Sequence, residues 1–318
     1  MEIAKENYRD FLGLGAWSLD PRWYSFDEFN WFADKNYFNT YMLNFEGLGT
    51  TIYAAKKLKE KNCQLWLATA NAGIYFSYKE SLSEYMKRID NFVSKLKENE
   101  VWDSFIGFSY DEPLLKKYHT NQDLYDMTKA LYEAYGKRNF VCFSGQEVSG
   151  KKGNWNDPDG TLILESFATE YISDAGFDSY GYDFRKESSP AMERKYKSLN
   201  ETYPDIHDAE SYYKHYFDML KDRMINKDAK IWYFPCMYEV NTWGAFKSDE
   251  DYCIAHLKGF TDMLLKEKNP GGMMGYTFKS WSGNTVALDH FLGRNNPNRW
   301  ERFEEELYKA KKLLEAKR

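Results

Sequence analysis

The feature that most constrains the fold is an alternation of short apolar runs and longer amphipathic segments, repeated eight times along 318 residues. The runs are β-branched or aromatic and have the length of a buried strand, while the segments between them have helical spacing. Strands that alternate with helices pair in parallel, and eight such units in a chain of this length favour one closed barrel. The sequence therefore predicts an α/β fold, a single (β/α)8 barrel of the TIM type over residues 1–318.

The pattern also places the elements and the loops. The predicted strands begin at Phe11, Tyr37, Cys63, Ser104, Asn139, Gly176, Lys230 and Gly271. The predicted helices span 26–35, 48–61, 79–99, 121–136, 162–175, 208–227, 249–268 and 297–317. Two connections, 145–160 and 184–207, are long enough to be a lid or a wall over a site.

Charge and composition exclude several classes of function. The net charge is -6, and no basic block is long enough to follow a phosphate backbone, so no nucleic-acid partner is expected. No apolar run approaches the roughly 20 residues of a membrane span. The N-terminus lacks the features of a signal peptide, which predicts a cytoplasmic protein or an exported one whose signal peptide has been removed. The four cysteines, Cys63, Cys142, Cys236 and Cys253, are scattered and predicted to be buried free thiols.

In a barrel of this kind the chemistry lies at the C-terminal ends of the strands. These strand ends carry Trp17, Glu46, Asn71, Asp111, Glu112, Gln146, Asp183, Glu239, Trp243, Lys279 and Trp281. Carboxylates, amides and indoles dominate, and none of the five histidines falls at a strand end. Because a metal-dependent barrel needs histidine ligands there, we expect neither a metal nor another cofactor. The indoles are expected to stack on sugar rings and the polar side chains to contact a carbohydrate.

The stretch "FIGFSYDEPLL" delivers two adjacent acids at the end of the fourth strand, Asp111 and Glu112, and Pro113 follows at once. Such residues can simply end a strand and cap a helix. The alternative is acid/base chemistry, because hydrolysis of a glycosidic bond needs a carboxylic acid and a second carboxylate. Glu239, after the seventh strand, could face Glu112 across the barrel mouth. Burial and the charge of Asp111 would then keep Glu112 protonated.

Strand geometry restricts this hypothesis. Strict alternation would turn Asp111 inward and Glu112 outward, so both can face the mouth only if the strand is interrupted. We therefore predict a β-bulge near Tyr110.

Glu112 after the fourth strand, Glu239 after the seventh and Trp281 after the eighth make the chain resemble the retaining glycoside hydrolases of clan A. The resemblance covers the architecture of nearly the whole chain but only a few positions. It implies that Glu112 is the acid/base and Glu239 the nucleophile. In that clan an asparagine precedes the acid/base and bonds the sugar 2-hydroxyl, whereas this chain has Asp111.

The adjacent acids in "DEP" are also similar to those of β-N-acetylhexosaminidases that use substrate assistance. That resemblance implies that Asp111 holds the 2-acetamido group, that Glu112 is the acid/base, and that Tyr233 or Tyr238 completes the grip. Glu239 would then be only a sugar ligand. A third alternative is a non-catalytic carbohydrate-binding barrel, which would keep the aromatic residues but lack a working acid/base pair.

Overall fold

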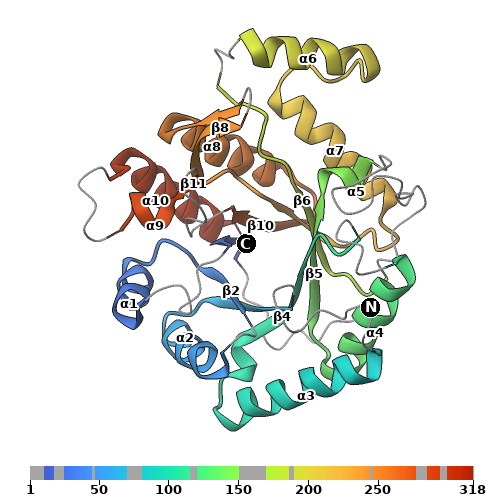
Figure 1. Cartoon of the computed structure of the whole chain (residues 1–318), viewed down its shortest axis with the longest axis vertical. Coiled ribbons are helices and arrows are strands. Elements are labelled where there is room, and N and C mark those ends of the chain that lie inside the picture. Colours follow the sequence, from blue (N-terminus) through green and yellow to red (C-terminus); the bar gives the residue numbers. More distant parts are fainter. Residues whose placement is uncertain are drawn as a thin grey trace.

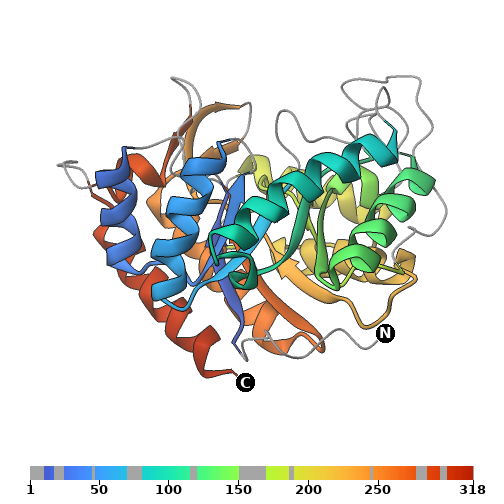
Figure 2. The same cartoon turned by 90° about the horizontal axis from the view of Figure 1, so that it is seen from below.

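A computed structural model shows eight parallel strands curved into a nearly closed barrel that is surrounded by helices (Figures 1 and 2). The strand order is β1-β10-β7-β6-β5-β4-β3-β2, with β1 and β2 at the two edges. The predicted (β/α)8 barrel is confirmed. The structure describes residues 11–17, 25–44, 47–69, 81–114, 120–149, 170–185, 190–243, 246–276, 285–293 and 299–317.

The barrel strands are β1 (Gly13–Ala16), β2 (Thr40–Asn44), β3 (Gln64–Ala68), β4 (Phe105–Asp111), β5 (Arg138–Ser144), β6 (Asp174–Asp178), β7 (Lys230–Tyr233) and β10 (Pro270–Gly275). A separate antiparallel sheet contains β8 (Tyr238–Trp243), β9 (Phe246–Ser248) and β11 (Thr285–Ala287). The helices are α1 (Phe26–Lys35), α2 (Leu48–Glu60), α3 (Leu82–Glu98), α4 (Asn121–Tyr135), α5 (Gly145–Ser149), α6 (Pro190–Thr202), α7 (Ala209–Arg223), α8 (Glu250–Lys266), α9 (Leu288–Phe291) and α10 (Glu301–Ala316). A short 3-10 helix, Trp102–Ser104, precedes β4.

Local sequence determines where several helices begin. At α3, the Ser81 hydroxyl accepts a hydrogen bond from the Glu84 backbone N–H at 3.2 Å, and the Glu84 carboxylate accepts one from the Ser81 N–H at 2.9 Å. This reciprocal capping box satisfies two backbone donors that a helix start leaves unpaired. The same arrangement starts α1 at Ser25 and α4 at Thr120. No helix in the described ranges is both long and apolar enough to cross a membrane.

Asn39 joins the two edges of the barrel. Its side-chain oxygen accepts a hydrogen bond from the Leu14 N–H at 2.6 Å, and its own N–H donates to the Leu14 carbonyl at 3.0 Å. Gly15 allows the close approach, because a Cβ there would lie 2.4 Å from the Thr40 carbonyl oxygen. One buried residue, through its backbone N–H and its side chain, thus links β1 to the start of β2.

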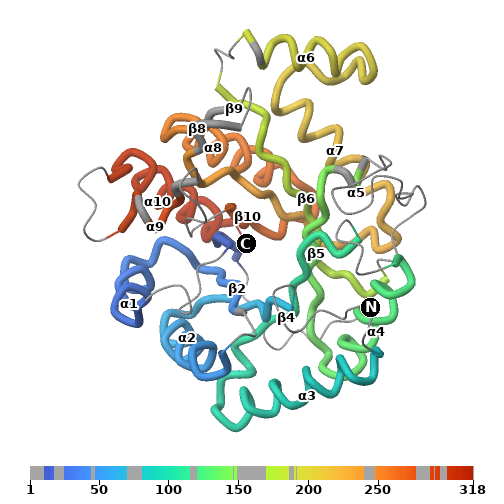
Figure 3. The backbone as a smooth tube through the Cα atoms, in the orientation of Figure 1, coloured from blue at the N-terminus to red at the C-terminus, as the bar shows by residue number. Residues whose placement is uncertain are grey.

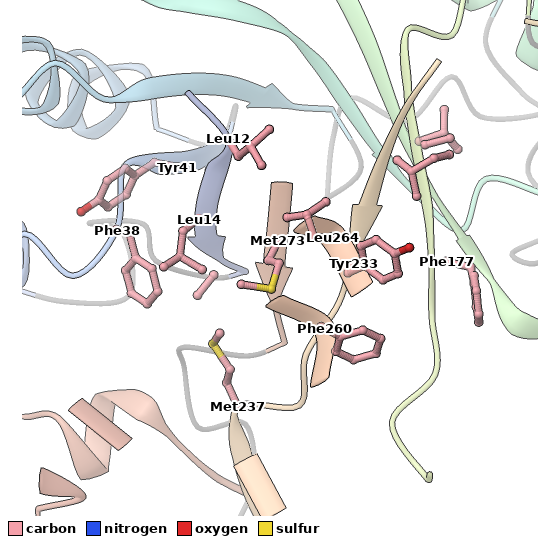
Figure 4. Close-up of a cluster of buried hydrophobic side chains, with 14 of the residues drawn as sticks. Leu12, Leu14, Phe38, Tyr41, Phe177, Tyr233, Met237, Phe260, Leu264 and Met273 are labelled. Atoms are coloured by element: carbon pink, nitrogen blue, oxygen red, sulfur yellow. The ribbon is translucent and has the colours of Figure 1, made fainter. Parts of the chain in front are cut away.

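The strands are buried on both faces. Figure 4 shows part of the outer core, where Tyr233 of β7 and Met273 of β10 lie beside Phe260 and Leu264 of α8. The inner core contains Trp66, Phe140 and Trp232, together with Trp17, Met42, Ala68, Ile106, Cys142, Phe234 and Met274. The barrel interior is therefore packed with side chains, and chemistry is confined to its rim.

A buried ion pair lies within this interior. The Arg138 Nε donates to Asp174 Oδ2 at 2.7 Å, and the Trp232 indole N–H donates to Asp174 Oδ1 at 2.8 Å. The guanidinium also lies over the Trp66 ring at 5.2 Å. Because Arg138 begins β5 and Asp174 begins β6, this network lies at the end of the barrel opposite the C-terminal rim.

The structure corrects the predicted elements in the second half of the chain. β6 begins at Asp174, inside the predicted helix 162–175, most of which lies outside the described residues. The predicted loop 184–207 contains α6, which lies beyond α7 and outside the ring of helices (Figure 1). The run after Lys230 forms β7, keeps a parallel bridge from Cys236 to Tyr276 after β10, and then continues into β8 of the antiparallel sheet (Figure 3).

Candidate functional site

Asp111 and Glu112 lie at the C-terminal end of β4, and both are half-buried. Asp111 pairs with Cys142 of β5, which belongs to the inner core, so Asp111 faces the barrel interior. The Glu112 N–H still bonds the Cys142 carbonyl at 2.7 Å, but its φ of 44° is left-handed. Such a backbone is uncommon and costs about 1–3 kcal/mol for a residue other than glycine. Ordinary alternation therefore ends at Glu112.

The interruption of β4 is not where the sequence predicted it. The register with β5 is continuous through Tyr110, so the predicted bulge there is wrong. The register with β3 instead shifts between Phe105 and Gly107. As a result, Phe105 and Phe108 both lie in the outer core although they are three residues apart. The shift near the start of the strand sets which residues face inward, Asp111 among them.

Asp178, at the end of β6, is a third carboxyl at this position, and the sequence analysis missed it. Asp178 pairs with Ser144 of β5, and Gly176, two residues earlier, pairs with the inward-facing Cys142. Residues two apart on a strand share a face, so Asp178 also lies on the inward face of the sheet. Burial raises its pKa well above the ordinary value, and the charges of Glu112 and Asp111 raise it further. A 3.2 Å hydrogen bond from the Tyr180 hydroxyl acts in the opposite direction.

We call Asp111, Glu112 and Asp178 the carboxyl cluster. It joins the ends of β4 and β6, which flank β5 (Figure 1). The signal in the sequence was "GFDSYG", but the predicted strand continued through it, which moved the expected strand end to Asp183.

Glu147 braces the turn that carries two of these acids. Its buried carboxylate accepts a hydrogen bond from the Leu114 N–H at 2.7 Å and another from the Ser144 N–H. The Glu147 N–H donates in return to the Ser144 hydroxyl at 3.1 Å. Glu147 therefore ties the turn after Glu112 to the junction of β5 and α5.

Three tyrosines from different strand ends gather beside Asp178. Tyr180 stacks on Tyr276 with ring centroids 5.3 Å apart and an interplanar angle of 24°. Tyr238 contacts both rings edge-on, at 5.9 Å and 5.7 Å. Tyr180 and Tyr276 also pack against the inner core that includes Trp17, which is itself buried. We call these three residues the tyrosine group.

Glu239 and Trp243 lie on β8, which begins two residues after Cys236, where the chain is still bridged to the continuation of β10. Glu239 is half-buried and pairs with Val286 of β11 in the antiparallel sheet. Trp243 ends β8, and its side chain lies outside the described residues. Both residues therefore follow the β7 segment, whose Cys236 still bridges in parallel to Tyr276 after β10, and their roles at the site stay predictions.

Tyr233 and Asp183 have structural partners away from the carboxyl cluster. The Tyr233 hydroxyl donates to Glu267 at 3.2 Å, and its ring packs on Phe217 in the outer core at 4.2 Å. This outward orientation contradicts its predicted role as an acetamide partner. Asp183 is buried, and both of its carboxylate oxygens accept hydrogen bonds from Arg185, at 2.6 to 3.0 Å.

Several predictions fall where the structure gives no side-chain position. Glu46, Asn71, Lys279 and Trp281 lie outside the described residues, as does the side chain of Gln146 in α5. The four cysteines are buried and free, which confirms their predicted state. Among the residues with described positions, no three His, Cys, Asp or Glu side chains are arranged to hold a metal ion.

No protein-family model and no curated protein sequence matches the chain. Among solved structures, the chain resembles a β-glucuronidase from Ruminococcus gnavus in complex with uronic deoxynojirimycin (8% identity, TM-score 0.52, 87% of this chain, 45% of that one). It also resembles GH5_18 from Streptomyces cattleya in complex with GlcNAc (9%, 0.58, 98% and 82%). A third is the exo-β-1,4-mannosidase Op5Man5 from Opitutaceae bacterium strain TAV5 (15%, 0.56, 99% and 63%). These neighbours are glycoside hydrolases, the chain spans less than half of the glucuronidase, and identities this low show a shared fold alone.

Proposed function

We propose that the chain is a glycoside hydrolase whose reaction centre is the carboxyl cluster, with Glu112 as the acid/base. The observation that carries the proposal is the end of β4, where Asp111 faces inward and Glu112 adopts a strained left-handed backbone. Strain of this kind persists where the surrounding structure holds it in place, often at active sites. The glycosidases among the structural neighbours support the same class of reaction.

The chemistry requires one proton transfer at each half of the reaction. The protonated Glu112 carboxyl gives its proton to the glycosidic oxygen while the bond to the anomeric carbon breaks. In the retaining version, Glu239 is the nucleophile, and Glu112 then takes a proton from the water that releases the sugar. This version requires the two carboxyls to lie about 5–5.5 Å apart, and it predicts that Glu239→Gln abolishes turnover.

A second candidate mechanism is substrate assistance by a 2-acetamido sugar. It is favoured by Asp111, which replaces the asparagine of clan A beside Glu112 and could orient the acetamido group. Tyr238 is the tyrosine that would complete the grip, since it belongs to the tyrosine group next to Asp178. This version requires a 2-acetamido group on the substrate and tolerates Glu239→Gln.

The test is a screen of aryl glycosides with and without a 2-acetamido group, using the wild type, Glu112→Gln and Glu305→Gln. Glu305 is an exposed residue of α10 and serves as the matched control. We expect Glu112→Gln to lower turnover by at least about 100-fold, the usual contribution of general acid–base catalysis. Wild-type turnover in Glu112→Gln contradicts the proposal. Glycan binding without any turnover by the wild type favours a non-catalytic carbohydrate-binding barrel.

A further inference from the structure

We propose that Asp178 shares the catalytic proton with Glu112 and thereby sets the pH range in which Glu112 works as an acid. The inference rests on the proposed function. It gives Asp178 the role of holding the proton that Glu112 donates. It also gives β6 a part in a site that the sequence analysis assigned to β4 and β7.

The ends of β4 and β6 bring their carboxyls to the same face of the sheet, on either side of β5. Register places Asp111 level with Cys142 on β5, and Asp178 lies two residues further along the adjacent β6, on the same inward face. Burial raises the pKa of the Cys142 thiol, and the charges of Asp178, Asp111 and Glu112 raise it further. The three carboxyls therefore lie within electrostatic reach of the Cys142 thiol, on the face of the sheet that register assigns to Asp111 and Asp178.

A buried hydroxyl without a hydrogen-bond partner lies below the carboxyl cluster. Ser109 precedes Asp111 by two residues and so shares its inward face. Its side chain is fully buried, and its Oγ has no hydrogen-bond partner among the described residues. Buried polar groups are rarely left unsatisfied, so an unpaired hydroxyl at this level is consistent with a position that a water or a ligand group occupies.

Titratable groups gather around Asp178 and act on its charge. They interact with Asp178 from several places: Asp111 of β4, Glu112 just after it, Cys142 of β5, and Glu147 of α5. Tyr180 donates a hydrogen bond to it, and Tyr238 of β8 lies close enough that the Asp178 charge raises the tyrosine pKa. These neighbouring charges oppose the ionisation of Asp178, so Asp178 keeps its proton at a higher pH than a lone carboxyl does.

Protonated Asp178 passes its proton to the Glu112 carboxylate, directly or through a water. Glu112 gives that proton to the glycosidic oxygen, which keeps the electron pair of the breaking bond while the nucleophile, Glu239 or the acetamido oxygen, bonds to the anomeric carbon. In the second half of the reaction a water oxygen bonds to the anomeric carbon and the nucleophile leaves with its electron pair. The proton that the water loses returns to Glu112 and so to the pair of carboxyls.

The test compares pH profiles of kcat/KM for wild type, Asp178→Asn and Tyr180→Phe, with Asp262→Asn as an exposed control on α8. Asp178→Asn leaves Glu112 to hold the proton alone, so the basic limb should move to lower pH by about one unit or more. Tyr180→Phe removes the hydrogen bond that favours the charged form, so the limb should move to higher pH. If Asp178 has only a structural role, the basic limbs of the two pH profiles do not shift in opposite directions. Basic limbs that stay unshifted in both variants overturn the inference.

A second measurement does not depend on activity. The carboxyl carbon of Glu112 can be titrated by ¹³C NMR, with its signal assigned by its absence in Glu112→Gln. We expect its titration to move to lower pH in Asp178→Asn, and an unchanged titration refutes proton sharing. An inactive Glu112→Gln with unshifted limbs rejects only the role of Asp178, whereas an active Glu112→Gln rejects the proposed function itself.

Discussion

His256 should make the protein lose stability as the pH falls below about 6.5. It lies fully buried in α8, where its Nδ1 accepts a hydrogen bond from the Cys236 N–H at 3.4 Å and its Nε2 donates to the Tyr182 carbonyl at 2.6 Å. The bond at Nδ1 requires the neutral ring, because a protonated Nδ1 has no lone pair to accept with. Burial lowers the pKa of His256 from 6.5 to about 3. Because Cys236 follows β7 and Tyr182 follows β6, this ring ties α8 to two segments that lead from the barrel rim.

The size and sign of the effect follow from that pKa. Because the folded-state pKa is depressed, the unfolded chain binds the proton first, so the stabilisation is complete above pH 6.5 and is lost as the pH falls towards 3. Between pH 7 and pH 5 the loss amounts to about 2 kcal/mol. Asp178 acts with the opposite sign, because its pKa is raised and protonation stabilises the folded state. A comparison of variants is therefore needed to isolate His256.

The assay is urea unfolding at pH 7, 6 and 5 for wild type, His256→Gln and the control His207→Gln. Glutamine can replace the donor and the acceptor but does not take up a proton, and His207 is exposed. We expect the pH dependence of the unfolding free energy to be smaller by about 2 kcal/mol in His256→Gln and unchanged in the control. The same pH dependence in all three proteins would refute the argument.

Two further substitutions test the support of the site. In Glu147→Gln, an amide donor faces one of the two backbone N–H groups, on Leu114 or Ser144, that the carboxylate accepts from. We therefore expect turnover to fall and the free energy of unfolding in urea to decrease by about 1–3 kcal/mol. Unchanged turnover would show that this brace does not position Glu112. Gly107→Ala would put a methyl 2.3 Å from the Arg138 carbonyl oxygen, so we expect a loss of about 1–3 kcal/mol or more, whereas Gly49→Ala in α2 meets no atom within 4 Å and should be tolerated. Equal stability of the two alanine variants would contradict this packing argument.

The sequence by itself determined the architecture and the most informative pair of residues. Strand and helix periods are local properties, so eight alternations predict a barrel without knowledge of any long-range contact. Capping boxes at Ser81 and Thr120 likewise mark helix starts from a few neighbouring residues. The adjacent Asp111 and Glu112 were recognisable because two acids at the end of a buried run are hard to explain by packing alone.

Only the tertiary structure decided which other residues accompany that pair. Strand ends depend on pairing with neighbouring strands, so the end of β6 at Asp178 and the pairing of Glu239 with Val286 in a separate antiparallel sheet had no local signal strong enough to predict them. The side chain of Tyr233 points outward because its partners come from α7 and α8. The raised pKa of Asp178 depends in part on the charge of Glu112, which is 66 positions away in the sequence. Charges interact according to their distance in space, and that distance cannot be read from the separation along the chain.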